Sequence, residues 1–174
     1  MVLVCFVYFI KKTENMEHKK FTVTDDLLAS RGQRLSNFII DLAIEYVIWI
    51  SVGATIAIFA DVANSTFLKT WISTMGMLEK GLSFAVISGF YYYLTELYFS
   101  RSIAKFLTKT YVIMKDGSKP NYKSILKRTL CRFIPFEVFS FLGETADGWH
   151  DSMSETYVVK KHEFEKQKKI IILP

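Results

Sequence analysis

The sequence contains little cysteine and glycine, and each shortage excludes a class of protein. Its 174 residues include two cysteines, Cys5 and Cys131, without the spacing of a metal-binding cluster, so we expect free thiols and no disulfide framework. The eight glycines form neither a phosphate-binding loop nor a nucleophile elbow, and there is no Cys/His cluster. We therefore expect that the chain is not an enzyme and that it uses neither a cofactor nor a bound metal.

Charged residues are also scarce in two long segments. Residues 35–60 carry only Asp41 and Glu45, and this run exceeds the roughly 20 apolar residues needed to cross a bilayer. In residues 77–100, Glu96 is the only charged residue after the first turn. The pattern predicts an all-α membrane protein built on a hairpin of two transmembrane helices, at about 35–60 and 77–100.

Three charges on the first predicted helix share one face. At 100° per residue, Arg34, Asp41 and Glu45 point within about 20° of a common direction. Glu96 lies near the same end of the second helix, so the three carboxylates occupy the inner part of the bilayer. Acidic groups inside a membrane often bind ions or relay protons, which makes Asp41, Glu45 and Glu96 candidates for cation or proton binding.

The alternative role for these acids is structural. Arg34, Arg101 and Lys105 lie below them and are the expected charge partners, so that ion pairs would fix the inner ends of the helices. We expect Arg34 to neutralise Asp41 or to bind a lipid phosphate.

Basic residues indicate how the hairpin is oriented. Many flank its two ends, whereas the connection between the helices has only Lys69 and Lys80, so both termini should face the cytoplasm of a multi-pass cell-membrane protein. The same flanks explain the net charge of +5 without nucleic acid. Small residues recur every four positions and predict close helix packing in the outer half of the membrane. They are Gly53 and Ala57, and Gly81, Ala85 and Gly89.

The chain divides into three parts. Residues 1–33 are an N-terminal cytoplasmic or interfacial segment, in which Thr24 or Asp25 begins a short surface helix. We assign no function to residues 1–15. Residues 34–160 form the membrane domain, and residues 161–174 are a charged tail that we expect to be mobile.

The region after the second helix is basic and is expected to be cytoplasmic. Thr110–Met114 and Thr156–Val159 are predicted strands that could pair beneath the membrane. Between them, a helix that starts at Pro120 and Asn121 is basic and amphipathic, a pattern that suits an anionic membrane surface. Its basic residues are Lys123, Lys127, Arg128 and Arg132. Residues 133–143 are predicted to be interfacial or re-entrant.

This domain has a distinctive sequence pattern at each end. The opening pattern is R-L-S-N-F-I-I-D, from Arg34 to Asp41, and the closing pattern is W-H-D-S-M-S-E-T-Y-V-V, which contains His150, Asp151 and Thr156. Together these patterns resemble the RDD family of small membrane proteins. Between them, the chain has the further matches Glu96, S-R-S-I-A-K ending at Lys105, YVIMKDG, Arg128 and Arg132. Ser102 and Ala104 stand where threonine and glycine are usual, which weakens the expectation of a tight glycine turn.

The resemblance implies a membrane location and a role in transport, without a mechanism. Our leading hypothesis is that the chain, as a homo-oligomer or with an unidentified membrane partner, helps to move a small cation or another solute. The alternative is a non-transporting anchor or scaffold whose basic surface binds anionic lipid headgroups or a partner protein. Asp147, His150 and Asp151 could be metal ligands, but a hydrogen-bonded loop is the favoured interpretation.

Overall fold

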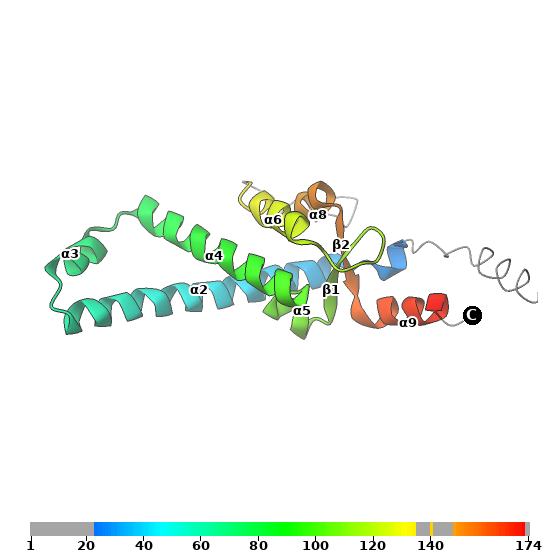
Figure 1. Ribbon diagram of the computed structural model, residues 1–174, viewed down its shortest axis with the longest axis horizontal. Helices are drawn as coiled ribbons and strands as arrows, with labels where there is room; N and C mark the ends of the chain where they lie inside the picture. The colour runs from blue at the N-terminus through cyan, green and yellow to red at the C-terminus, as the bar shows by residue number, and fades with distance from the viewer. Residues whose placement is uncertain (1–22, 135–139, 141–147, 173–174) are drawn as a thin grey trace, which may run out of the picture.

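The computed structural model describes residues 23–134, 140 and 148–172 of the chain, and this part is mostly helical. Two long helices, α2 and α4, run side by side at one end of the molecule and diverge toward the other, where the short helix α3 connects them (Figure 1). Short helices and a two-stranded sheet gather around the end where α2 begins. Residues 1–15, Asp147 and most of the expected re-entrant segment lie outside the described residues.

Helix α2 spans Arg31–Val62 and begins with a capping box. Ser30 Oγ accepts a hydrogen bond from the Gln33 amide at 3.2 Å, and the Gln33 side chain accepts one from the Ser30 amide at 3.0 Å. These bonds satisfy amides that the first turn would otherwise leave free. The short surface helix predicted before this point is a single 3₁₀ turn, Asp25–Leu27, preceded by Thr24.

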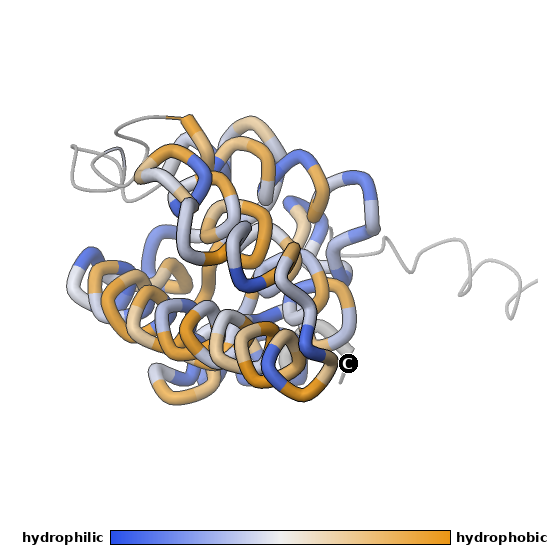
Figure 2. The backbone as a smooth tube through the Cα atoms, turned by 90° about the vertical axis from the view of Figure 1, so that its left-hand side faces the viewer, coloured by the Kyte–Doolittle hydropathy of each residue, from blue (hydrophilic) through white to orange (hydrophobic). Residues whose placement is uncertain are grey.

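Helix α2 is the one helix in the described part of the chain that is long and apolar enough to cross a membrane. Only 6% of its most apolar 18-residue window is buried inside the structure, so the rest of the described chain does not cover this part of the helix. Helix α4, Met77–Phe99, has 23 residues, but its tyrosines and Glu96 make it less apolar. Figure 2 shows that hydrophobic residues recur along the turns of the helices.

The predicted close packing of small residues in the outer half of the hairpin is wrong. Helices α2 and α4 diverge toward α3, Thr66–Thr74. A Cβ added at Gly53 or Gly81 would meet nothing within 4 Å, so neither glycine is at a tight helix contact. Gly89 differs, because a Cβ there would lie 3.2 Å from the Phe133 ring.

The two predicted strands form and pair. Strand β1, Thr110–Met114, is antiparallel to β2, Thr156–Lys160, and Val112 lies opposite Val158 in the register. The segment before α2 adds to the free edge of β2, since the Ala29 amide donates to the Val158 carbonyl at 2.8 Å. The small core beside the sheet centres on Leu27, Ile113 and Val159.

The remaining helices correct two expectations. Helix α6, Tyr122–Cys131, exposes Lys123 and Lys127 but buries Arg128 completely, so its basic residues do not form one solvated face. The expected mobile tail is helix α9, Lys161–Ile172, whose Phe164 packs against the core beside the sheet. The described residues also form the short helices α5, Ile103–Leu107, and α8, Trp149–Ser154.

Candidate functional site

The inner half of α2 presents a polar face to the rest of the molecule. Arg34, Asn37, Asp41 and Glu45 are each at most 5% exposed, although they belong to a helix that is otherwise exposed and apolar. The spacing of the three charged residues predicted their common face, and the structure buries all three. Asn37 completes the face: its amide donates to Thr110 Oγ1 at 3.3 Å, and its carbonyl oxygen accepts from Thr108 Oγ1 at 2.5 Å.

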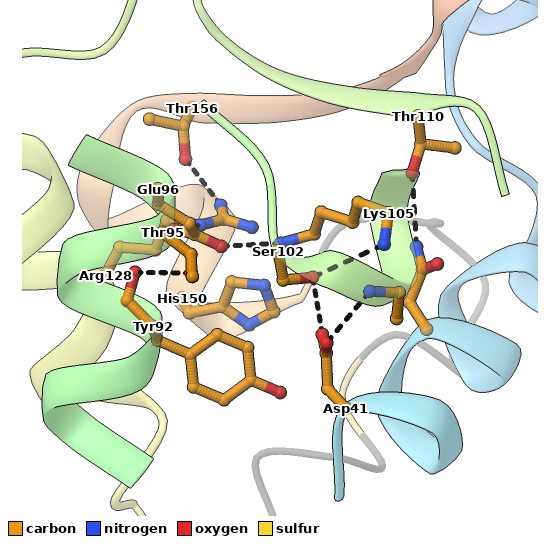
Figure 3. Close-up of polar contacts among 12 residues, drawn as sticks. Asp41, Tyr92, Thr95, Glu96, Ser102, Lys105, Thr110, Arg128, His150 and Thr156 are labelled. Carbon is orange, nitrogen blue, oxygen red and sulfur yellow. Dashed lines mark hydrogen bonds and ion pairs between the residues drawn. The ribbon is translucent and has the colours of Figure 1, made fainter. Parts of the chain in front are cut away.

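Asp41 is held by neutral donors. One carboxylate oxygen accepts from the Tyr91 hydroxyl at 2.7 Å and the Ala104 amide at 3.1 Å. The other accepts from the Ser102 hydroxyl at 2.5 Å (Figure 3). These donors join α2 to α4 and to the beginning of α5, where Ser102 is the N-cap. Ser102 and Ala104 depart from the usual family residues, yet a serine hydroxyl and a backbone amide both satisfy Asp41.

Glu96, on α4, is surrounded by cations instead. Its Oε1 atom accepts from Lys105 Nζ at 2.5 Å and from Arg132 Nη2 at 3.0 Å, and its Oε2 atom accepts from Arg128 Nε at 2.9 Å. The Glu96 side chain is fully buried. Lys105 was expected to be a charge partner of the acids, and in the structure it pairs with Glu96. Burial lowers the pKa of Lys105 to about 8, against the opposing attraction of Glu96.

Asp151, on α8, is a second meeting point of cations. It forms ion pairs with Arg34 and Arg128, and His150 Nε2 lies 3.3 Å from its Oδ1 atom. Burial alone would raise the pKa of Asp151, but the positive charges of Arg128, His150 and Arg34 hold this pKa well below its ordinary value. Asp151 is therefore an ionised, paired group.

Arg128 connects the two acidic centres. It binds Glu96 through Nε and Asp151 through Nη1, which also donates to Thr156 Oγ1 at 2.7 Å. We call this set of buried or partly buried groups the charge cluster. It consists of Arg34, Glu96, Lys105, Arg128, Arg132 and Asp151. The cluster joins α2, α4, α5, α6 and α8, and breaking a pair of this kind costs about 3–5 kcal/mol, since the remaining charge is buried alone.

Two pairings differ from the sequence-based expectation. Arg34 forms its ion pair with Asp151, 117 positions away, a partner that we did not predict. Arg101 stacks between rings, 3.5 Å from the Phe106 centroid and 4.5 Å from the Tyr111 centroid, and forms no ion pair with a described residue. Arg128 was missed as a site residue; its place three positions after the apolar Ile125 is a signal for the buried face of its helix.

Glu45 has a different environment from the other acids. It is 3% exposed, and its carboxylate has hydrogen bonds with the Ser88 and Tyr92 side chains. Its Oε1 atom, however, is buried with no hydrogen-bond partner among the described residues. The side chain borders a cavity of about 210 Å³, whose walls include Phe38, Ser88, Tyr92 and Phe133. Glu45 is thus the predicted ion-binding acid whose hydrogen bonding is incomplete.

The cluster itself encloses little space. A cavity of about 40 Å³ lies among Arg34, Asn37, Lys105 and His150, with room for water but not for an organic solute. Within the described ranges, no group of three His, Cys, Asp or Glu side chains could hold a metal ion. The buried groups around Asp151 are a hydrogen-bonded network.

Comparison with known proteins identifies one family. The model of the RDD family matches residues 28–153, well over half of the chain. The matched range contains both ends of the charge cluster, Arg34 and Asp151. It stops before Thr156, the hydroxyl partner of Arg128. Neither the curated proteins nor the solved structures give a match.

Proposed function

We propose, from the premise that this chain belongs to the RDD family of membrane-associated proteins, that it crosses the membrane twice, through α2 and α4, with both termini in the cytoplasm. Helix α4 supports a second span because its outer surface carries exposed large apolar side chains. They are Leu82, Val86, Phe90 and Leu94. The basic residues at the sheet-bearing end support a cytoplasmic location for that end.

We further propose that the chain contributes to transport of a small cation or another solute, with Glu45 as the group that exchanges a proton. Asp41 and Glu96 are poor candidates for this task. Asp41 already accepts three hydrogen bonds, and Glu96 already binds three cations. Neither can accept or release an ion without breaking bonds that join the helices.

The observation that carries this proposal is the unpartnered Glu45 oxygen beside a cavity. A buried ionised carboxylate with one oxygen that lacks a donor is costly, and binding a proton lowers that cost. The carboxylate takes up H⁺ to become the neutral acid, and release of H⁺ restores the charge that attracts a cation. One hairpin does not enclose a pathway, so the proposal includes several copies of the chain or a membrane partner.

Flux measurements test this proposal. The purified protein is reconstituted in liposomes with an internal pH dye, and a gradient of Na⁺ or K⁺ is applied. Glu45→Gln keeps the shape of the side chain but cannot titrate, so we expect a correctly folded variant with lost proton flux. Glu165→Gln, which removes an exposed acid on α9, is the matched control. Wild-type flux in Glu45→Gln would remove Glu45 from the mechanism.

The alternative function is a membrane anchor that recruits anionic lipid or a partner protein. The exposed Lys123 and Lys127 on α6 favour it. This function predicts no proton flux in the wild-type protein, and binding that depends on these lysines rather than on Glu45.

A further inference from the structure

An apolar groove of about 500 Å³ lies between α4 and α6. We call it the α4–α6 groove. Leu82, Val86 and Phe90 form its α4 wall, and Leu126, Leu130 and Phe133 form the opposite wall. Each of these six side chains is at least 46% exposed. An exposed apolar surface of this size is unfavourable in water, so on a membrane-associated protein we expect it to contact lipid or another apolar partner.

Helix α6 packs beside α4 so that the groove runs along α4, away from the cytoplasmic end of α4. Its other face is anchored, since Ile125 and Arg128 are completely buried. Beyond the helix end, the Phe133 ring packs closely on Gly89. Gly89 is ten residues before Phe99, the last residue of α4, or about 15 Å along the helix. In the proposed two-span arrangement, on which this inference rests, Phe133 is therefore within the apolar layer.

Two lysines on α6 are neighbours of residues that line the groove. Lys123 and Lys127 are exposed, and each lies three residues before a groove-lining leucine, Leu126 or Leu130. Side chains three positions apart are neighbours on a helix surface. Tyr122 is also exposed, and Lys123 Nζ lies 5.9 Å from the centre of its ring. A tyrosine beside lysines is typical of the boundary between headgroups and acyl chains.

We infer that the α4–α6 groove binds one anionic phospholipid, with an acyl chain against the apolar walls and the phosphate at Lys123 and Lys127. An acyl chain suits the groove because the walls are almost entirely apolar. A second copy of the chain suits it less well. A two-fold contact places the same surface on both subunits and would bring these lysines toward their own counterparts. The lysines also distinguish an anionic headgroup from a zwitterionic one.

Lipid binding can be measured on the full chain. The protein in neutral detergent is mixed with phosphatidylglycerol or phosphatidylcholine of identical acyl chains, and bound lipid is counted by native mass spectrometry. We expect preferential binding of one phosphatidylglycerol. Each lysine near a membrane surface contributes about fivefold in affinity, so Lys123→Gln with Lys127→Gln should lower phosphatidylglycerol binding about 25-fold. The control is Lys166→Gln with Lys169→Gln on α9, which changes the charge equally on exposed residues and should leave binding unchanged.

A second variant tests the groove itself. Val86→Trp adds bulk to the α4 wall and should reduce binding of both lipids, whereas Ile58→Trp, on the exposed surface of α2, should not. Equal binding of the two lipids, an equal loss in the α9 control, or full binding by Val86→Trp would each overturn the inference. So would occupation of the groove by a second copy, seen as a dimer that Val86→Trp dissociates. Lipid binding is measured without any proton flux. A failure of the proposed Glu45 mechanism can therefore be distinguished from a failure of lipid binding in the groove.

Discussion

The two ends of the α2–α4 pair are joined in different ways. At the sheet-bearing end, the charge cluster connects five elements through buried ion pairs. At the α3 end, the helices separate around an apolar cavity of about 350 Å³. There, Trp49 Nε1 donates to Ser83 Oγ at 2.9 Å. Polar contacts rather than close packing of small residues therefore determine where the helices meet.

This difference has a physical cause. If α2 and α4 both cross the membrane, as proposed, their apolar side chains gain little by leaving lipid for each other, so the hydrophobic effect does not hold the two helices together. A buried charge, in contrast, must have a partner, because the isolated ion is strongly disfavoured. The need to pair buried charges thus holds α2 and α4 together at the sheet-bearing end. No such need holds them together at the α3 end.

Removing Arg128, the cation shared by both acidic centres, should have the largest effect on the stability of the protein. Arg128→Ala leaves Glu96 and Asp151 each without one partner, and we expect a loss of about 3–5 kcal/mol in the free energy of unfolding. Arg128→Lys should recover only part of it, because an ammonium cannot span the two acids as a guanidinium does. Unfolding of the protein in detergent micelles measures both changes.

The neighbouring residue provides the control for Arg128. Lys127→Ala removes an exposed charge from the same helix, and its stability should stay within about 0.5 kcal/mol of the wild type. Equal stability of Arg128→Ala and Lys127→Ala would contradict the assignment of the charge cluster as the connection between the helices.

Low pH should weaken the contacts of the charge cluster, which lies at the sheet-bearing end of the α2–α4 pair. Because the pKa of Asp151 is lower in the folded chain than its ordinary value of 3.8, the folded state binds fewer protons than the unfolded state below about pH 4. The stabilisation from Asp151 is therefore complete above that pH and is lost as the pH falls further. Thermal unfolding between pH 7 and 3 measures this loss.

Two variants assign the acid effect to its source. Asp151→Asn should be less stable at pH 7 and should lose less further stability on acidification than the wild type. Asp61→Asn, on the open end of α2, should retain the wild-type pH dependence. An unchanged dependence in Asp151→Asn would mean that other acids are responsible.

The smallest effects are expected from glycine substitutions, which compare how closely α2 and α4 pack at different points along their length. Gly53→Ala and Gly81→Ala add a methyl group to open space, so neither should lower stability. Gly89→Ala must displace the Phe133 ring by a few tenths of an ångström and should be the least stable of the three. The comparison uses unfolding in the same micelles. A marked loss in Gly53→Ala would show that the outer halves of the helices do pack closely.

Local periodicity determined much of this fold. The long apolar runs gave the extents of α2 and α4 to within a few residues, and the strand at Thr110–Met114 was predicted in full. The 3.6-residue repeat also placed Arg34, Asp41 and Glu45 on one face. Such features depend on neighbours within a few turns, and a sequence contains that information directly.

Partner choice required the tertiary structure. Periodicity gives the direction of a side chain on its own helix, but not which distant group it faces. Arg34 and Asp151 are 117 positions apart, and Arg128 meets Asp151 only because α6 packs beside α8. The same packing buried Arg128, which a basic amphipathic pattern had assigned to the surface. The sequence by itself thus determined which residues are charged within an apolar chain; the folded arrangement decided which charges neutralise one another and left Glu45 incompletely bonded.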